Sequence, residues 1–220
     1  MINELLPPGV VAVEAFTDPP AATLYPEEEA LVARAVDKRR REFATVRACA
    51  REALARLGLP PAPILPGPRG EPGWPAGVVG SMTHCDGYRA CVLGRAAGVR
   101  AIGLDAEPDG ALPDGVLGMV SLPPEREMLA GLATRAPGPS WDRLLFCAKE
   151  SVYKAWYPLA GRWLDFSEAE VTLDPGGTFD VRLLVPGPVV DGRELTGFAG
   201  RWLASDGLLA TLIVVPADGT

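Results

Sequence analysis

The feature that most constrains the fold is a pair of matching hairpin signals, each centred on Asp-Gly, that stand 120 positions apart. Asp-Gly between two β-type runs is the strongest short-range signal for a tight hairpin. Each signal belongs to a half with one long amphipathic helix, so we predict an α+β fold of two pseudo-symmetric halves, each an antiparallel sheet packed with a long helix. Alternatively, two unrelated hairpins use the same favoured turn. The matched positions are Gly80 with Gly200, Asp86 with Asp206, Gly87 with Gly207, and Ala90 with Ala210.

The predicted halves comprise residues 1–103 and 104–220, with the active site at their interface. Pro26 and the glutamates after it favour a helix start, and apolar residues at helical spacing, ended by Gly58, predict a helix over 42–57. The Pro- and Gly-rich stretch that follows is expected to be an ordered loop. The remaining expected elements are a helix over 141–157 and strands over 78–84, 88–93, 99–104, 169–173, 179–185, 196–203 and 208–215.

The composition excludes several classes of protein. An apolar fraction of 48% over 220 residues is enough for a globular core. No run approaches the roughly 20 apolar residues of a membrane span, and the N-terminal sequence lacks the pattern of a signal peptide, so we expect a cytoplasmic protein without a membrane partner. Four cysteines without C-x2-C spacing and a single histidine argue against a zinc site and indicate reduced thiols.

The charge is unevenly distributed. A net charge of −7 argues against general nucleic-acid binding, yet basic residues crowd the segment from Lys38 to Arg51, with Arg39 and Arg47 among them. This cluster is either a solvated helix face or an anion site, and charge alone does not separate the two interpretations.

Three carboxylates and one ammonium are spaced so that they can converge. Asp105 and Glu107 share one face of a strand, and Glu150 and Lys154 share one face of a helix. Three ionised carboxylates need a cation between them, and Mg²⁺ with oxygen ligands leaves coordination positions open for phosphates. The pattern indicates a phosphate-handling enzyme. The alternatives are a solvated turn for Asp105 and Glu107 and ordinary helix support for Glu150 and Lys154.

His84, the single histidine, stands at an expected strand end just before a turn, where a side chain faces a cleft. With an ordinary pKa of about 6.5, its imidazole can donate to a phosphate when neutral or pair with it when charged. A structural role is the alternative. Ser81 and Thr83 add hydroxyl donors, but no pattern places Ser81 in a nucleophile elbow.

Taken in order, three motifs resemble those of the Sfp-type 4′-phosphopantetheinyl transferases, the family of the enterobactin synthase component D group and of actinobacterial enzymes that serve polyketide and lipid synthases. The resemblance extends from residue 26 to the C-terminus and implies a fold of two pseudo-symmetric α+β halves. The motifs are Trp74-Pro75-x-Gly77-x-x-Gly80-Ser81-x-Thr83-His84-Cys85, Gly103-x-Asp105-x-Glu107-Pro108, and Phe146-x-Ala148-Lys149-Glu150-Ser151-x-Tyr153-Lys154-Ala155.

By this resemblance, Asp105, Glu107 and Glu150 are expected to bind Mg²⁺, which also contacts the pyrophosphate of coenzyme A. Lys154 is expected to neutralise the phosphate and the leaving group. Glu150 is similar to the family's proposed general base, acting directly or through a metal-bound water, and its roles as ligand and base compete.

The resemblance also implies a coenzyme A site. Arg39, Arg47 and His84 match positions that grip the 3′-phosphate, with Ser81 and Thr83 nearby, and Gly67 and Arg69 lie on the loop beside the adenine. Relatives often carry lysine before that glycine, whereas this chain has Pro66, so either coenzyme A binding is weakened or Arg69 substitutes.

The implied reaction transfers 4′-phosphopantetheine from coenzyme A to a serine of an apo acyl or peptidyl carrier protein and releases adenosine 3′,5′-bisphosphate. Residues 112–130 are the candidate docking surface for the carrier, with a plain buried segment as the alternative. We expect a monomer. The competing functions are a non-catalytic coenzyme A or nucleotide-binding protein, which has no need of Glu150 and Lys154, and another phosphotransferase, which would be expected to show a G-x-x-x-x-G-K-[ST] loop that is absent here.

Overall fold

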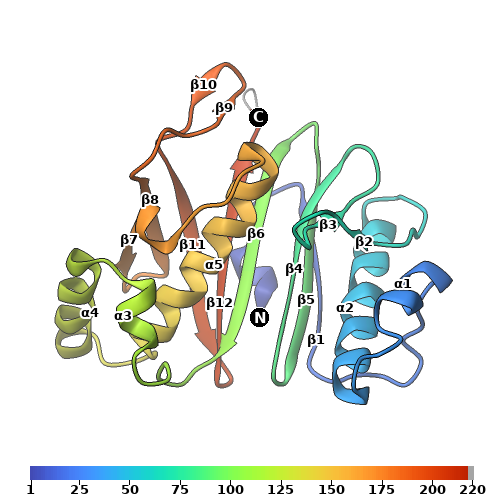
Figure 1. Cartoon of the computed structure of the whole chain (residues 1–220), viewed down its shortest axis with the longest axis horizontal. Helices are drawn as coiled ribbons and strands as arrows, with labels where there is room; N and C mark the ends of the chain where they lie inside the picture. The colour runs from blue at the N-terminus through green and yellow to red at the C-terminus, as the bar shows by residue number, and fades with distance from the viewer. Residues whose placement is uncertain (218–220) are drawn as a thin grey trace.

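A computed structural model describes residues 1–217 and shows two α+β halves side by side (Figure 1). None of the helices in this range is long and apolar enough to cross a membrane. The helices are η1 (Ile2–Leu5), α1 (Pro26–Leu31), α2 (Asp37–Arg56), α3 (Val116–Val120), α4 (Pro123–Arg135), α5 (Trp141–Ala160) and η2 (Phe166–Glu168). The strands are β1 (Val10–Ala15), β2 (Leu65–Pro66), β3 (Pro72–Gly73), β4 (Val78–Cys85), β5 (Tyr88–Arg95), β6 (Val99–Pro108), β7 (Ala169–Asp174), β8 (Thr178–Leu183), β9 (Val189–Val190), β10 (Arg193–Glu194), β11 (Gly197–Ser205) and β12 (Leu208–Pro216).

The N-terminal half is a three-stranded antiparallel sheet of order β1-β5-β4, covered on its outer face by α2 (Figure 1). Small and branched apolar residues of α2, such as Ala50 and Leu54, pack against Cys91 and Leu93 of β5. Burial of this apolar face, rather than helix propensity alone, holds α2 on the sheet.

The C-terminal half is a five-stranded antiparallel sheet of order β6-β12-β11-β8-β7, with α5 lying across it. Val152 and Trp156 of α5 are buried against the strands, together with Leu209 and Ile213 of β12. The helix approaches β6 at Gly103, where a Cβ atom would clash with the carbonyl oxygen of Ser151. Gly103 therefore allows α5 to lie directly on the strand that carries the predicted acidic residues.

The two halves repeat the same arrangement, which confirms the predicted α+β fold and the repeat of 120 positions. Gly80 pairs with Leu93 in the first hairpin, and Gly200 pairs with Ile213 in the second, so the strand register is identical. The order β1-β5-β4 corresponds to β6-β12-β11, and β7 and β8 extend the second sheet. A shared apolar layer, to which β1, β5, β6 and β12 contribute, joins the halves.

The two sheets meet where β4 lies beside β6, although no backbone ladder pairs these strands. The hydroxyl of Ser81 accepts a hydrogen bond from the Leu104 amide at 3.1 Å, and that of Thr83 accepts one from the Ala106 amide at 3.2 Å. We call these four residues the β4–β6 seam. Both bonds advance in the same direction along the two strands, so the strands run parallel here.

Several predicted boundaries differ from the structure. The boundary between residues 103 and 104 lies inside β6, which pairs with β12 along its length, so the sheets divide between β5 and β6. α2 begins five residues before the predicted start, in a basic run with good helix propensity. α5 continues through Pro158 to Ala160, because a proline in the last turn removes one amide without breaking the turns before it, and Gly161 ends the helix at φ 63°.

Other elements escaped the sequence analysis. β6 continues past its expected end at residue 104 to Pro108, so Asp105 and Glu107, predicted to share one strand face, lie within the strand. The expected loop 60–77 contains the two-residue strands β2 and β3. Segment 112–130 forms α3 and most of α4, in which Val120 and Leu129 are buried while Met119 is 73% exposed.

Replacing Gly103 with alanine tests the close approach of α5 to β6. The added methyl group has only backbone atoms to displace, so we expect Gly103→Ala to lower the free energy of unfolding by about 1 to 3 kcal/mol. Chemical denaturation measures the difference. Gly110→Ala is the matched control, because its Cβ would meet nothing within 4 Å. An equal loss in both variants would contradict this account.

Candidate active site

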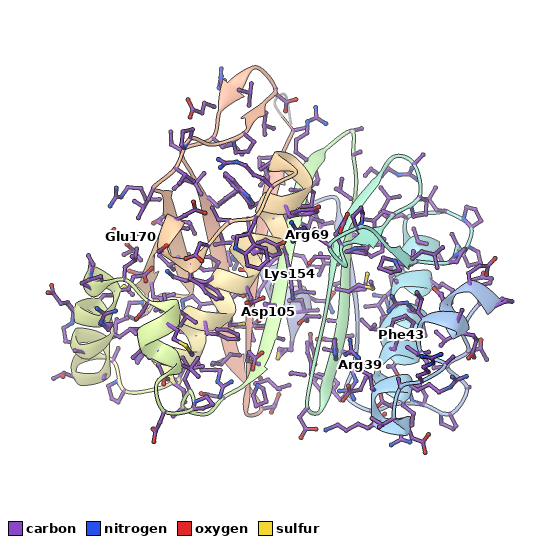
Figure 2. The ribbon with its side chains drawn as sticks, viewed as in Figure 1. Arg39, Phe43, Arg69, Asp105, Lys154 and Glu170 are labelled. Atoms are coloured by element: carbon purple, nitrogen blue, oxygen red, sulfur yellow. The ribbon has the colours of Figure 1, made fainter. Side chains whose placement is uncertain are left out.

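A cavity of about 870 Å³ lies between the halves, where α2, the β2–β3 hairpin, β4, β6 and α5 adjoin. Figure 2 shows Arg39 and Phe43 on α2 at one side, Lys154 and Asp105 at the other, and Arg69 above. The predicted residues that line this cavity are Arg39, Arg47, Arg69, Ser81, His84, Glu150 and Lys154. Those that lie outside its lining are Gly67, Thr83, Asp105 and Glu107.

An ion pair between Asp105 and Lys154 joins β6 to α5 at the inner end of the site. The Lys154 ammonium donates to Asp105 Oδ1 at 2.7 Å and to the Leu104 carbonyl oxygen at 2.9 Å. Burial acts to lower the pKa of Lys154, but the charge of Asp105, the hydrogen bond to it and the charge of Glu150 together outweigh burial, so the pKa is raised. Lys154 is therefore a fixed cation at neutral pH.

The second oxygen of Asp105 is left without a partner. Asp105 is 5% exposed, and its Oδ2 has no hydrogen-bond partner within residues 1–217. A buried carboxylate oxygen without a donor carries a large desolvation cost, and a bound cation offsets that cost. The atom is therefore suited to ligate a metal ion.

The negative charge of Asp105 affects both Glu107 and Glu150. Burial first, and then the negative charge of Asp105, raise the pKa values of both glutamates. Glu107 is partly compensated by Arg143 of α5, whose guanidinium donates to Glu107 Oε2 at 3.2 Å. Carboxylate oxygens are hard donors of the kind that Mg²⁺ prefers.

Within residues 1–217, no three His, Cys, Asp or Glu side chains stand close enough to hold a metal ion as they are placed. The carboxylates are instead engaged with cations, Asp105 with Lys154 and Glu107 with Arg143. The sequence analysis missed Arg143, because its spacing from Glu107 carries no local signal. Its guanidinium also donates hydrogen bonds to the carbonyl oxygens of Gly110 and Ala111, which follow β6.

The opposite wall of the cavity carries positive charge. Arg47 is 7% exposed, its guanidinium lies 3.2 Å from the centre of the Phe43 ring, and its Nε has no hydrogen-bond partner within the described chain. Burial lowers the pKa of Arg47 to about 10, and the buried carboxylate of Glu28, 3.9 Å away, partly opposes this effect. An incompletely compensated buried cation at a cavity wall favours an anionic ligand.

Arg39 and His84 form a second basic pair. The Arg39 guanidinium bonds to Nε2 of His84. Because arginine only donates, the imidazole accepts at this nitrogen and is neutral. Desolvation in the cavity wall, followed by the charge of Arg39, lowers the pKa of His84 to about 4.

The β2–β3 hairpin brings Arg69 to the outer part of the cavity. Glu71 organises this turn, because its side chain accepts from the Arg69 amide at 2.9 Å and its carbonyl oxygen accepts from the Gly67 amide at 2.7 Å. A Cβ atom at Gly67 would meet the Glu71 carboxylate, so a larger residue there would displace this carboxylate from the Arg69 amide. Pro66 also lines the cavity.

Ser81 and Thr83 are both expected to contact a cofactor, and Ser81 lines the cavity. Its hydroxyl oxygen accepts from the Leu104 amide. Thr83 is 4% exposed and donates to Asp105 Oδ1 at 3.2 Å. Thr83 therefore belongs to the acidic centre rather than to the cavity surface.

Aromatic residues of α5 also contribute to the site. Tyr153 and Tyr157 line the cavity, while Trp156 is fully buried. A smaller cavity of about 180 Å³ adjoins Glu150 and Tyr153 and is bounded by Trp163. Helical spacing alone does not separate core aromatics from those at a cavity.

Because His84 is the single histidine, its imidazole gives an unambiguous signal in NMR spectra recorded against pH. We expect the wild-type protein to titrate well below the ordinary value of about 6.5. Arg39→Gln removes a neighbouring positive charge, so the pKa of His84 should rise. A wild-type value at or above 6.5 would be inconsistent with this geometry.

Comparisons with known proteins agree with the motifs and the fold. Residues 27–94 match the 4′-phosphopantetheinyl transferase N-terminal domain, and residues 101–202 match the 4′-phosphopantetheinyl transferase superfamily. The chain is 65% identical to the 4′-phosphopantetheinyl transferase Svp of Streptomyces mobaraensis, over 99% of this chain and 90% of that protein. It is 52% identical to PptT of Mycobacterium tuberculosis, over 92% and 90%, and 52% identical to Npt of Nocardia iowensis, over 97% and 99%. The chain therefore belongs to the 4′-phosphopantetheinyl transferase family.

Proposed function

We propose that the cavity between the halves binds coenzyme A and transfers its 4′-phosphopantetheine to a serine of an apo acyl or peptidyl carrier protein, releasing adenosine 3′,5′-bisphosphate. The observation that carries this proposal is the pairing of a basic wall on α2 with the acidic centre and lysine on β6 and α5. The basic wall suits a terminal phosphate, and the acidic centre with its lysine suits the pyrophosphate at which the reaction occurs.

Arg39, Arg47 and His84 bind the 3′-phosphate in this proposal. Arg47 is a buried cation whose Nε has no hydrogen-bond partner among the described residues. Arg39 donates to the imidazole of His84 at the same cavity wall. Charge-assisted bonds from guanidinium to phosphate are stronger than bonds between neutral groups. Arg69 then borders the adenine, and Gly67 lies in the same turn behind it.

Asp105, Glu107 and Glu150 are the proposed ligands of Mg²⁺. The unpartnered Oδ2 of Asp105 and the hard-oxygen donor set support this assignment. The bound ion supplies positive charge that lets a pyrophosphate approach three carboxylates. Binding requires the pair between Glu107 and Arg143 to adjust, since the three carboxylates do not form a closed cluster as they stand.

Glu150 and Lys154 act on the reacting groups. Without a bound ion, burial and then the charge of Asp105 raise the pKa of Glu150, which favours it as the acceptor of the carrier serine's proton. Ligation of Mg²⁺ by the same carboxylate competes with this role. Lys154 stays charged and neutralises the phosphate and the leaving group. Positioning and charge neutralisation supply most of the rate enhancement in phosphoryl transfer.

The setting of the reaction is also part of the proposal. The enzyme acts as a cytoplasmic monomer without nucleic-acid or membrane partners, as its net charge of −7 favours. The carrier docks on segment 112–130, where the exposed Met119 offers apolar surface beside the site. The alternative is a non-catalytic coenzyme A-binding protein. Such a protein has no need of Glu150 and Lys154, so their presence in the cavity counts against it.

The basic wall is tested with coenzyme A and its 3′-dephospho analogue. We expect Arg39→Gln to weaken the binding of coenzyme A by about 10- to 100-fold, because one charge-assisted bond contributes about 1.5 to 3 kcal/mol. Binding of the analogue should weaken much less, because it lacks the phosphate that accepts this bond. Calorimetry measures both affinities. Arg40→Gln on the same helix is the control, since Arg40 pairs with Glu29 outside the cavity. Equal losses for both ligands would show that Arg39 does not contact the 3′-phosphate.

The reaction is tested by incubating the protein with coenzyme A and apo carrier proteins, with Mg²⁺ or a chelator, and weighing the carriers by mass spectrometry. We expect a Mg²⁺-dependent gain of one phosphopantetheine group and a fall of about 100- to 10,000-fold in rate for Glu150→Gln. Tight coenzyme A binding with no gain on any carrier would instead support the non-catalytic binder.

A further inference from the structure

We infer that Thr83 is a positioning residue that directs the Asp105 carboxylate toward the metal ion, rather than a contact for coenzyme A. The inference rests on the proposed Mg²⁺ site and assigns a residue that fixes one of its ligands. It starts from the observation that the two oxygens of this buried carboxylate are treated differently by their surroundings.

The two strong donors that reach Asp105, the Lys154 ammonium and the Thr83 hydroxyl, act on the same oxygen. Lys154 donates to Oδ1 at 2.7 Å and the Thr83 hydroxyl donates to Oδ1 at 3.2 Å, while Oδ2 has no hydrogen-bond partner within residues 1–217. A carboxylate held in this way cannot exchange its oxygens by rotation without breaking both bonds. The oxygen left for a metal ion is therefore always Oδ2.

The direction of the Thr83 hydroxyl is determined by its other bond. The Ala106 amide donates to Thr83 Oγ1 at 3.2 Å, which uses a lone pair of the hydroxyl. The hydroxyl carries one proton, and that proton is then directed to Asp105. Threonine is also stiff at χ1, so the donor is held in place by the strand.

The other neighbours of Asp105 do not replace this bond. The side chain of Cys147 also interacts with Asp105, but a thiol is only a weak hydrogen-bond donor. Thr211 lies opposite Asp105 on β12, but its hydroxyl is engaged with the Cys147 carbonyl oxygen at 3.0 Å. Thr83 is thus the strong neutral donor among these neighbours.

Ser81 is a natural control for a purely structural role. Its hydroxyl accepts from the Leu104 amide in the same seam and in the same way as Thr83 accepts from Ala106. The hydrogen bond of Ser81 joins it to Leu104 and does not reach Asp105. Loss of Ser81 therefore weakens the seam without releasing the carboxylate.

The experiment measures the Mn²⁺ affinity of the full chain by electron paramagnetic resonance, with coenzyme A present. The unfolding temperature and the Mg²⁺ dependence of kcat are measured for the same variants. We expect Thr83→Val to weaken Mn²⁺ binding by about 10- to 100-fold, as loss of a group that orients a metal ligand does. Thr83→Ser keeps the hydroxyl and should restore binding. Ser81→Ala should lower the unfolding temperature as Thr83→Val does, but leave the Mn²⁺ affinity near the wild-type value.

Equal Mn²⁺ affinities for Thr83→Val and the wild-type protein would overturn the inference, as would equal losses in Thr83→Val and Ser81→Ala. If Thr83→Val does not fold, Thr83→Ala takes its place with the same expectations. A wild-type protein that binds no Mn²⁺ with coenzyme A present would overturn the proposed metal site, and the inference with it. The failure of each idea therefore gives a different pattern of results.

Discussion

The active site depends on how the unpaired edge of β6 is satisfied. Backbone amides at a buried sheet edge need acceptors, and here the hydroxyls of Ser81 and Thr83 supply them in place of a neighbouring backbone. The carbonyl oxygen of Leu104 on the same edge accepts from Lys154. One strand edge thus joins the two halves and holds the lysine of the site. Because the bonds come from side chains, the sheets stay separate and a cavity opens between α2 and α5.

The electrostatics follow from that placement. Asp105 is buried beside Lys154, and its charge raises the pKa values of Glu107 and Glu150 in addition to the effect of burial. Breaking a buried ion pair is costly, so Asp105 and Lys154 hold each other in place. The acidic centre has one fixed cation and an unpartnered oxygen, whereas the wall on α2 has the buried cation of Arg47. Complementary charges of this kind fit a ligand that is anionic at both ends.

The two halves share a backbone plan but not a chemistry. Cys91 and Thr211 are equivalent positions, and they pair with Val13 and Asp105 respectively. The position that is acidic in the second half is therefore apolar in the first. The N-terminal half contributes the basic residues of α2 instead. A duplicated arrangement of helix and sheet thus brings two different sets of side chains to one interface, and neither half contains the whole site.

The sequence alone determined the elements whose signals are local. Asp-Gly turns predicted the hairpins, and helical spacing predicted the two long helices. The positions of Asp105, Glu150 and Lys154 in their motifs indicated that these side chains lie near one another, and Asp105 and Lys154 form an ion pair. Only the tertiary structure decided which groups these residues contact. Arg143 reaches Glu107 from 36 positions away, and Thr83 turns from the cavity to Asp105 across the seam. Such contacts depend on how strands from different sheets lie side by side, and no periodicity along the chain encodes that placement.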